Sequence, residues 1–279
     1  MDPFYNDISF KISRLITRSY STSFSIAVSY LNPEIRDAIY SIYGFVRISD
    51  EIVDSFHDFD KTELLKKFEN DYYEALREGI SLNPVLNSFQ LVVRKYRIDD
   101  ELIQAFLNSM RTDLFKNGNY NSSEMKEYIF GSAEVVGLMC LKVFVNGDEK
   151  IYEELKDPAM KLGSAFQKVN FLRDLKNDVV SLNRSYFPDF DVNNFNDTVK
   201  NKIISDIEDD FSLSVSGIKK LPKDSKLPVL IAYNYYLSLL RKIKSTPAEK
   251  LMITRIRIPD YRKMLLLIKT FLTVKLNLI

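Results

Sequence analysis

Apolar residues recur at intervals of three and four along almost the whole chain, which is the spacing that lets an α-helix bury one face. Stretches with this spacing cover residues 8–28, 35–56, 63–76, 85–96, 101–115, 123–145, 149–156, 158–182, 197–218, 226–243 and 260–276. No stretch alternates apolar and polar residues as a half-buried strand does. The sequence therefore predicts an all-α protein.

Prolines and polar segments mark where the predicted helices begin and end. Four prolines fall in or near a first helical turn, where the missing N–H does no harm: Pro33, Pro84, Pro158 and Pro259. Asn32 and Asp157 precede two of them and are predicted N-caps. The polar segments 116–122 and 183–196 are predicted loops. Because no linker divides the chain, we expect one domain over residues 1–279.

Charge and glycine content exclude several classes of function. Lysine and arginine number 39 against 38 acidic residues, so the molecule has no overall field that would gather nucleic acid. None of the 8 glycines forms the phosphate-binding loops of Rossmann or P-loop proteins. We therefore expect no nucleic-acid partner, and the missing fingerprint leans against NADPH as a cofactor.

Two residues that occur once each limit the chemistry further. His57 is the single histidine, which excludes a histidine-rich zinc site, and we expect it on the surface at a helix end. Cys140 is the single cysteine and is predicted to be a buried apolar residue in a reducing, cytoplasmic compartment. No apolar run approaches the ~20 residues of a spanning helix, and the N-terminus has no secretory signal.

An acidic motif occurs twice, and its first copy lies in the predicted helix 35–56. Asp50 and Asp54 are four residues apart and share one face, with Arg47 one turn before Asp50. Mg²⁺ in proteins combines one or two carboxylates with waters and substrate phosphates. Taken alone, such a pair is far more often an ordinary solvated face.

The second copy is more informative because of its surroundings. Asn170, Asp174 and Asp178 form a row with a spacing of four, and Gln167 lies one turn earlier. Apolar residues fill the neighbouring faces of this helix, and carboxylates in apolar surroundings need compensating cations. If the two helices face each other across a cavity, divalent metal must neutralise the aspartates.

Such an arrangement suits a diphosphate. Metal held by the carboxylates would stabilise the leaving group as a C–O bond ionises, while Arg47 and Arg173 can donate to its oxygens. We expect Mg²⁺, with Mn²⁺ as the alternative. The 19 phenylalanines and 16 tyrosines could line a long apolar cavity and stabilise a carbocation, although each single ring is more often core.

Four blocks of the chain, in order, resemble the squalene and phytoene synthase family. The blocks are Ser21 to Phe24 with Leu31 to Pro33, then 36–54, then YIFGSAEVVGLM at 128–139, and finally 165–178 with Arg184 to Pro188. Glu134 stands where the family usually has glycine, and Asn183 replaces the glycine of a common glycine-arginine turn. The resemblance implies the isoprenoid-synthase type I fold, a single helical bundle around a central cavity.

The resemblance also implies the site residues. It assigns metal and diphosphate binding to Asp50, Asp54, Asn170, Asp174 and Asp178. It assigns catalysis to the four aspartates together with Tyr43, Arg47 and Arg173. Substrate binding falls to Ser21, Phe24, Tyr43, Arg47, Tyr128, Gln167, Asn170, Arg173, Tyr186 and, near the C-terminus, Arg262.

The implied reaction is the head-to-head condensation of two geranylgeranyl diphosphates to phytoene through a cyclopropylcarbinyl diphosphate, in carotenoid biosynthesis. A squalene or dehydrosqualene synthase using two farnesyl diphosphates is the first alternative. A non-catalytic scaffold relative is the second, although it would be expected to lose metal carboxylates that this chain keeps. A plain helical interaction module is the third. The substrate tails suggest a peripheral association with the inner membrane face, through residues such as Lys263, Met264 and Leu265.

Overall fold

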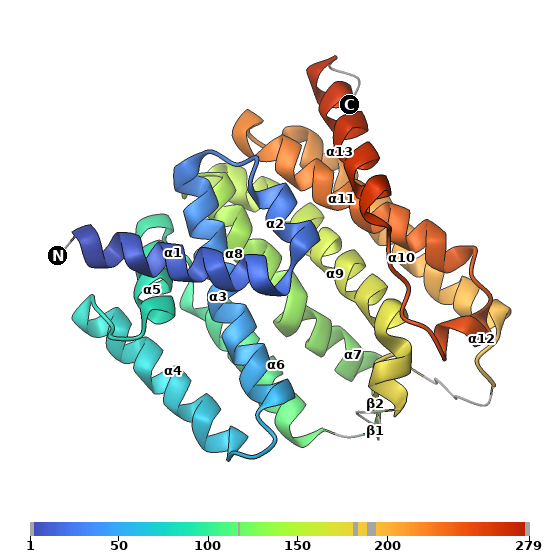
Figure 1. Cartoon of the computed structure of the whole chain (residues 1–279), viewed down its shortest axis with the longest axis horizontal. Coiled ribbons are helices and arrows are strands. Elements are labelled where there is room, and N and C mark those ends of the chain that lie inside the picture. The colour runs from blue at the N-terminus through green and yellow to red at the C-terminus, as the bar shows by residue number, and fades with distance from the viewer. Residues whose placement is uncertain (1–2, 117, 181–183, 189–193, 277–279) are drawn as a thin grey trace.

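The computed structural model describes residues 3–116, 118–180, 184–188 and 194–276, and almost all of them are helical (Figure 1). The helices are Pro3–Tyr20 (α1), Thr22–Val28 (α2), Pro33–Ser55 (α3), Lys61–Glu78 (α4), Pro84–Tyr96 (α5), Asp100–Phe115 (α6), Ser122–Ile129 (α7), Phe130–Glu134 (η1, a π-helix), Val135–Phe144 (α8), Glu149–Val180 (α9), Asp197–Lys220 (α10), Lys223–Lys244 (α11), Ala248–Leu251 (α12) and Asp260–Lys275 (α13). The all-α prediction is confirmed. The strands Gly118–Asn119 (β1) and Arg184–Ser185 (β2) form a short parallel pair inside segments predicted as loops.

The predicted helix over residues 8–28 is wrong, because the chain breaks at Ser21 into α1 and α2. Ser21 has an extended backbone and caps α2, its Oγ accepting a hydrogen bond from the N–H of Phe24 at 3.4 Å. Serine competes with the helix for such backbone bonds and therefore favours caps. The break redirects the chain, and Phe24 of α2 then lines the central cavity.

The predicted boundary at Asp157 and Pro158 is also wrong, because α9 runs through it as one helix of 32 residues. An internal proline loses one helical hydrogen bond, which costs about 3 kcal/mol. Packing offsets this cost: a Cβ placed on Gly217 of α10 would come within 2.4 Å of the Pro158 ring. The helix α11 contains Pro228 in the same way and begins earlier than predicted.

The predicted helix over residues 123–145 contains a π turn that the periodicity did not indicate. The turn is squeezed between two neighbours: a Cβ on Gly131 would come within 2.7 Å of the Ala105 carbonyl oxygen of α6. On the other side, a Cβ on Gly163 of α9 would come within 2.8 Å of the Ala133 oxygen. One extra residue in a turn re-aims the side chains after it, which is why π turns are frequent at functional sites.

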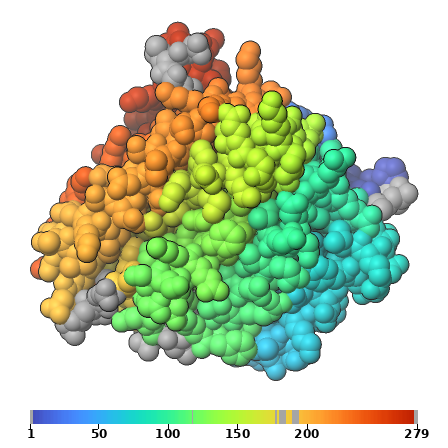
Figure 2. All heavy atoms as spheres, turned by 180° about the vertical axis from the view of Figure 1, so that it is seen from behind, coloured from blue at the N-terminus to red at the C-terminus, as the bar shows by residue number. Residues whose placement is uncertain are grey.

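Buried apolar side chains of the described residues gather in two clusters. The first joins α3 to α6 and α8 and contains Phe45 stacked on Phe89, with ring centroids 4.0 Å apart. The second joins α7 and α9 to α12 and contains Val169 and Leu172. From behind, segments running from α4 in cyan to α10 in orange form a continuous face (Figure 2). The helix α9 contributes to both clusters: Tyr152 and Leu155 near its start belong to the first cluster, whereas the part of α9 with the acidic motif belongs to the second.

Candidate active site

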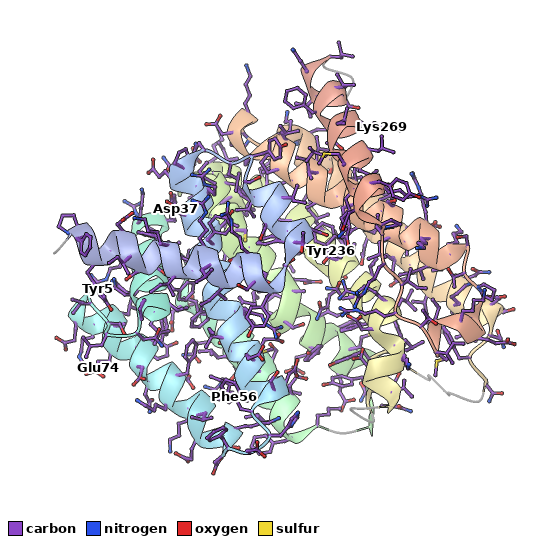
Figure 3. The ribbon with its side chains drawn as sticks, viewed as in Figure 1. Tyr5, Asp37, Phe56, Glu74, Tyr236 and Lys269 are labelled. Atoms are coloured by element: carbon purple, nitrogen blue, oxygen red, sulfur yellow. The ribbon has the colours of Figure 1, made fainter. Side chains whose placement is uncertain are left out.

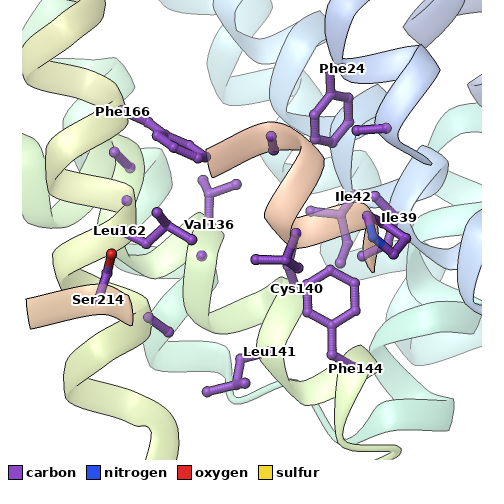
Figure 4. A pocket seen from close by; sticks show the side chains of 18 of the residues that line it. Phe24, Ile39, Ile42, Val136, Cys140, Leu141, Phe144, Leu162, Phe166 and Ser214 are labelled. Atoms are coloured by element: carbon purple, nitrogen blue, oxygen red, sulfur yellow. The ribbon is translucent and has the colours of Figure 1, made fainter. Parts of the chain in front are cut away.

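A cavity of about 300 Å³ lies among α3, α8 and α9 and is lined almost entirely by apolar side chains. Leu162 and Phe166 from α9 face Phe24, Ile39 and Ile42 across it (Figure 4). Its lining along α9 runs from Gln167 to Leu155, which at 1.5 Å per residue is ~18 Å of helix. The cavity therefore has the length and the lining expected for a hydrocarbon chain.

One end of the cavity lies next to both acidic motifs. On α9, Gln167 is the lining residue nearest in sequence to Asn170, and on α3 Tyr43 and Val46 are nearest to Asp50. Tyr43 stacks on Phe24 with ring centroids 5.0 Å apart. Burial raises the pKa of Tyr43, whose hydroxyl also feels Arg47, Asp50, Ser21 and Tyr236. Tyr43 therefore links the first motif to α11.

In the first motif, Arg47 pairs with Asp50 and Glu51, and its guanidinium lies 4.2 Å from the centre of the Tyr20 ring. Burial works to lower the pKa of Arg47, but the two carboxylates outweigh it and the pKa lies above its ordinary value. Burial, and then the charge of Asp54, raise the pKa of Asp50 to about 6 although Arg47 opposes them. Two carboxylates that crowd each other in this way are stabilised by an added cation.

In the second motif, two arginines hold Asp174. Arg173 donates from Nη2 to Oδ2 at 2.5 Å, and Arg255 donates from Nε to Oδ1 at 2.6 Å. Burial works to lower the pKa of Arg173, but Asp174 outweighs it and raises the pKa. Asp178 lies one turn further along α9 and is half-buried.

Asn170 connects the second motif to the cavity. Its Oδ1 accepts a hydrogen bond from the Tyr236 hydroxyl at 3.3 Å, and its Nδ2 donates to Gln167 at 3.4 Å. Gln167 in turn donates to the Ser132 hydroxyl of η1 at 3.3 Å. Burial raises the pKa of Tyr236, whose ring stacks on Phe166 with centroids 4.0 Å apart. Figure 3 shows Tyr236 inside the bundle, where it joins α11 to α9.

Tyr128 and Tyr186, which were predicted to bind substrate, are not among the residues that line the cavity. They stack on each other with centroids 5.0 Å apart, and Tyr186 stacks on Phe171 at 4.0 Å. The Tyr128 hydroxyl donates to Asp113 of α6 at 2.7 Å. These rings pack against α9 through Phe171, which follows Asn170 in the sequence.

Near the C-terminus, the arginine that reaches the site is Arg255 rather than Arg262. Arg262 is exposed, and its guanidinium lies 5.9 Å from the Tyr261 ring centre. Sequence reasoning missed Arg255, as well as Tyr20 and Tyr236. Arg255 lies in the same basic segment as Arg257 and Arg262, and the sequence pattern does not distinguish these three arginines.

The single histidine and the single cysteine of the chain lie in different surroundings. His57 is exposed and lies just after the end of α3, as predicted, with Nδ1 3.1 Å from the Lys61 amine. Cys140, predicted as a buried apolar residue, is partly buried: it packs against the first cluster and lines the cavity. Burial raises the pKa of its thiol to about 12, which leaves it uncharged.

The carboxylate that departs from the family pattern, Glu134, lies in the π turn. Burial raises its pKa to about 6, with Lys161 and Lys168 opposing and Asp210 adding to the shift. Ser132 and Ala133 line the cavity, whereas Glu134 is not among the lining residues. The other departure, Asn183, lies outside the described residues, as does part of the predicted loop 183–196.

The acidic side chains of the two motifs are arranged in pairs that can bind a metal ion. Within the described part of the chain, no three histidine, cysteine or acidic side chains form a ready-made metal cluster. The motifs instead offer pairs, Asp50 with Asp54 and Asp174 with Asp178, each one helical turn apart. Mg²⁺ characteristically takes one or two carboxylates and completes its shell with water and phosphate oxygens. Burial, and then the charge of Asp54, raise the pKa of Asp50, and a bound cation would offset this repulsion, so these residues fit such an ion.

The sequence profile of the squalene/phytoene synthase family matches residues 17–262. The chain belongs to this family. The phytoene synthase of Arthrospira platensis is 27% identical over 93% of this chain and 91% of its own length. The 15-cis-phytoene synthase of Synechocystis sp. is also 27% identical, over 85% of this chain and 77% of its own.

Solved structures agree on the fold. A dehydrosqualene synthase with bound ligand superposes with a TM-score of 0.83 at 22% identity, covering 98% of this chain and 99% of that one. A squalene synthase from Alicyclobacillus acidocaldarius gives a TM-score of 0.76 at 19% identity, covering 91% of this chain and 98% of the other. At these identities the likeness establishes the fold alone, and the predicted isoprenoid-synthase fold is confirmed.

Membership of the squalene/phytoene synthase family confirms the predicted enzyme class. The protein is a prenyltransferase of isoprenoid biosynthesis, from a family that acts on prenyl diphosphates and uses a divalent metal. Across the described helices, none combines the length and hydrophobicity that a membrane crossing needs.

Proposed function

We propose that this squalene/phytoene synthase homologue joins two geranylgeranyl diphosphates head to head and releases phytoene, through a cyclopropylcarbinyl diphosphate, for carotenoid biosynthesis. One observation carries the proposal: an apolar cavity lined along ~18 Å of α9 ends beside two acidic motifs that both hold arginines. The two relatives named above, a phytoene synthase and a 15-cis-phytoene synthase, support the choice of product.

In this proposal the chain's polar residues bind and orient the diphosphate groups. Asp50, Asp54, Asp174 and Asp178, with Asn170, would hold Mg²⁺, with Mn²⁺ as a substitute. The metal supplies positive charge that stabilises the departing diphosphate. Arg47 and Arg173 would donate to the diphosphate oxygens in place of the aspartates that they contact now. Tyr43 and Gln167 would orient the head of the substrate at the cavity end.

The apolar residues would guide the carbocation. The rings of Phe24, Tyr43 and Phe166 line the cavity beside the polar end, where their faces can stabilise an allylic cation. The walls beyond them exclude water, which would otherwise capture the cation as an alcohol. With no NADPH to deliver a hydride, the last cation would lose a proton, and the product is then a polyene.

The main alternative keeps this mechanism and changes the substrate to farnesyl diphosphate, with squalene or dehydrosqualene as the product. The end of the cavity away from the motifs decides between them, and Leu141, Phe144 and Leu155 lie there. A scaffold role is disfavoured by the retained motifs. We also propose that residues 1–279 act as one domain, because the cavity is lined by buried residues of the first cluster and by Leu162 and Phe166, which pack against the second.

Product analysis tests the proposal. Purified protein is incubated with geranylgeranyl or farnesyl diphosphate, with Mg²⁺ or a chelator, and with or without NADPH. Phytoene from the C20 substrate, dependent on Mg²⁺ and independent of NADPH, is the expected result. A C30 product would move the assignment to the farnesyl alternative. No product from a folded protein under any condition would favour the scaffold.

A further inference from the structure

The last helix, α13, presents a row of apolar side chains to solvent. Between 46% and 63% of each is exposed in the following residues: Tyr261, Met264, Leu265, Ile268, Phe271, Leu272 and Leu276. Their spacing of three and four places them on one face of the helix. A surface helix normally turns polar residues outward, so a row of this length needs a partner.

The opposite face of α13 already has its partner in the fold. Thr270 is buried, and its hydroxyl accepts a hydrogen bond from Asn234 of α11 at 2.8 Å. The helix therefore lies along α11 in a defined orientation, at the edge of the molecule (Figure 1). The exposed row is a result of this packing and points away from α11.

Positive charge surrounds the row. Residues 260–276 include four lysines and arginines and a single acidic residue, Asp260, although the whole chain is nearly neutral. Arg262, Lys269 and Lys275 are exposed on α13 itself, and Figure 3 shows Lys269 at the outer edge of the molecule. A partner for this face must therefore have an apolar layer with negative charge next to it.

We propose that the exposed face of α13 docks on an anionic lipid membrane. Helices that lie in the membrane interface combine an apolar face with lysine and arginine, whose long stems let the charges reach the headgroups. A second copy of the chain fits this surface less well, because a two-fold dimer would bring the same cations together. The cores of protein interfaces are also depleted in lysine.

Docking in this way would bring the cavity close to the lipid. The helix α11 lines the cavity with Pro228, Val229 and Ala232, and the same helix carries α13. The inference rests on exposure and charge alone, so it stands or falls independently of the reaction proposed above.

Vesicle co-sedimentation of the full chain tests the docking surface. Vesicles of phosphatidylcholine alone are compared with vesicles that also contain phosphatidylglycerol. We expect the protein to sediment with the anionic vesicles and to be released by salt. The double variant Leu265→Gln and Leu272→Gln should weaken binding about tenfold for each leucine. Lys269→Gln and Lys275→Gln should each weaken it about fivefold.

Matched controls come from the other half of the molecule. Leu82 is 95% exposed, and Leu82→Gln should sediment as the parent protein does. Lys66→Gln is the control for the lysine variants, and circular dichroism checks that every variant is folded. The proposal is overturned if the parent protein stays in the supernatant, or if the α13 variants bind as it does. It is also overturned if light scattering finds a dimer that the α13 leucine variants dissociate while vesicle binding is absent.

Discussion

The contact between Arg255 and Asp174 predicts that one arginine of the C-terminal segment matters more for catalysis than for stability. Arg255 makes two bonds to the carboxylate, Nε to Oδ1 at 2.6 Å and Nη2 to Oδ2 at 3.3 Å. Its side chain is 52% exposed, so the ion pair is screened and contributes only about 0.5–1 kcal/mol to folding. Arg255→Gln should therefore lower Tm by about 1–3 °C.

The effect on turnover should be larger. If Asp174 binds metal as proposed, Arg255 would be free to donate to the diphosphate, and a hydrogen bond between charged groups is worth about 1.5–3 kcal/mol. Its loss should reduce kcat/KM by about 10- to 150-fold. Steady-state kinetics with Mg²⁺ and a scanning calorimeter measure the two quantities on the same sample.

Two arginines of the same segment are the matched controls. Arg257 and Arg262 are exposed, and Arg257→Gln and Arg262→Gln should leave kcat/KM within about twofold. The reasoning is refuted if Arg255→Gln keeps parental turnover. If Arg262→Gln instead shows the large loss, the assignment made from the family resemblance is correct and the one made from the structure is not.

Three further predictions follow from the site and the cavity. Asp174→Asn should abolish Mg²⁺-dependent turnover while Tm changes by only a few degrees; unchanged turnover would support a plain interaction module. Asp50 has a folded pKa of about 6 against an ordinary 3.8, so its ionisation in the folded state is unfavourable and stability is lost as pH rises between these values. Asp50→Asn should thus raise Tm at pH 7 without Mg²⁺ and give no gain at pH 4; equal Tm differences at both pH values would contradict this. Phe144→Ala should lengthen the cavity and shift the preferred diphosphate, in competition assays, toward longer tails; an unchanged preference would place the limit on length elsewhere.

The acidic motifs were predictable because their geometry is local. A spacing of four within one helix places Asp50 with Asp54, and Asn170 with Asp174, on a shared face whatever the rest of the fold does. The raised pKa of Asp50 follows first from burial and then from the charge of Asp54, which lies on the same face of the helix.

The helix boundaries that failed depend on contacts between distant segments. The continuity of α9 through Pro158 depends on Gly217 of α10, and the π turn depends on close approaches to α6 and α9. Local propensity cannot include such contacts, since they join residues far apart in the sequence.

The sequence could not distinguish Arg255 from Arg262 for a related reason. Residues 253–259 are not helical, so no periodicity tells which side chain points at α9. Tyr236 was missed because its helix has other tyrosines at positions 233 and 235, and only the packing of α11 on α9 selects one of them.

The most direct test of the central claim is a crystal structure with Mn²⁺ and a non-hydrolysable thiolo analogue of geranylgeranyl diphosphate, with the metal located by anomalous scattering. We expect Mn²⁺ bound by Asp50 or Asp54 and by Asp174 or Asp178, each ion sharing the diphosphate, and the tail running along α9 toward Leu155. Metal at neither motif, or a tail outside the cavity, would contradict the account.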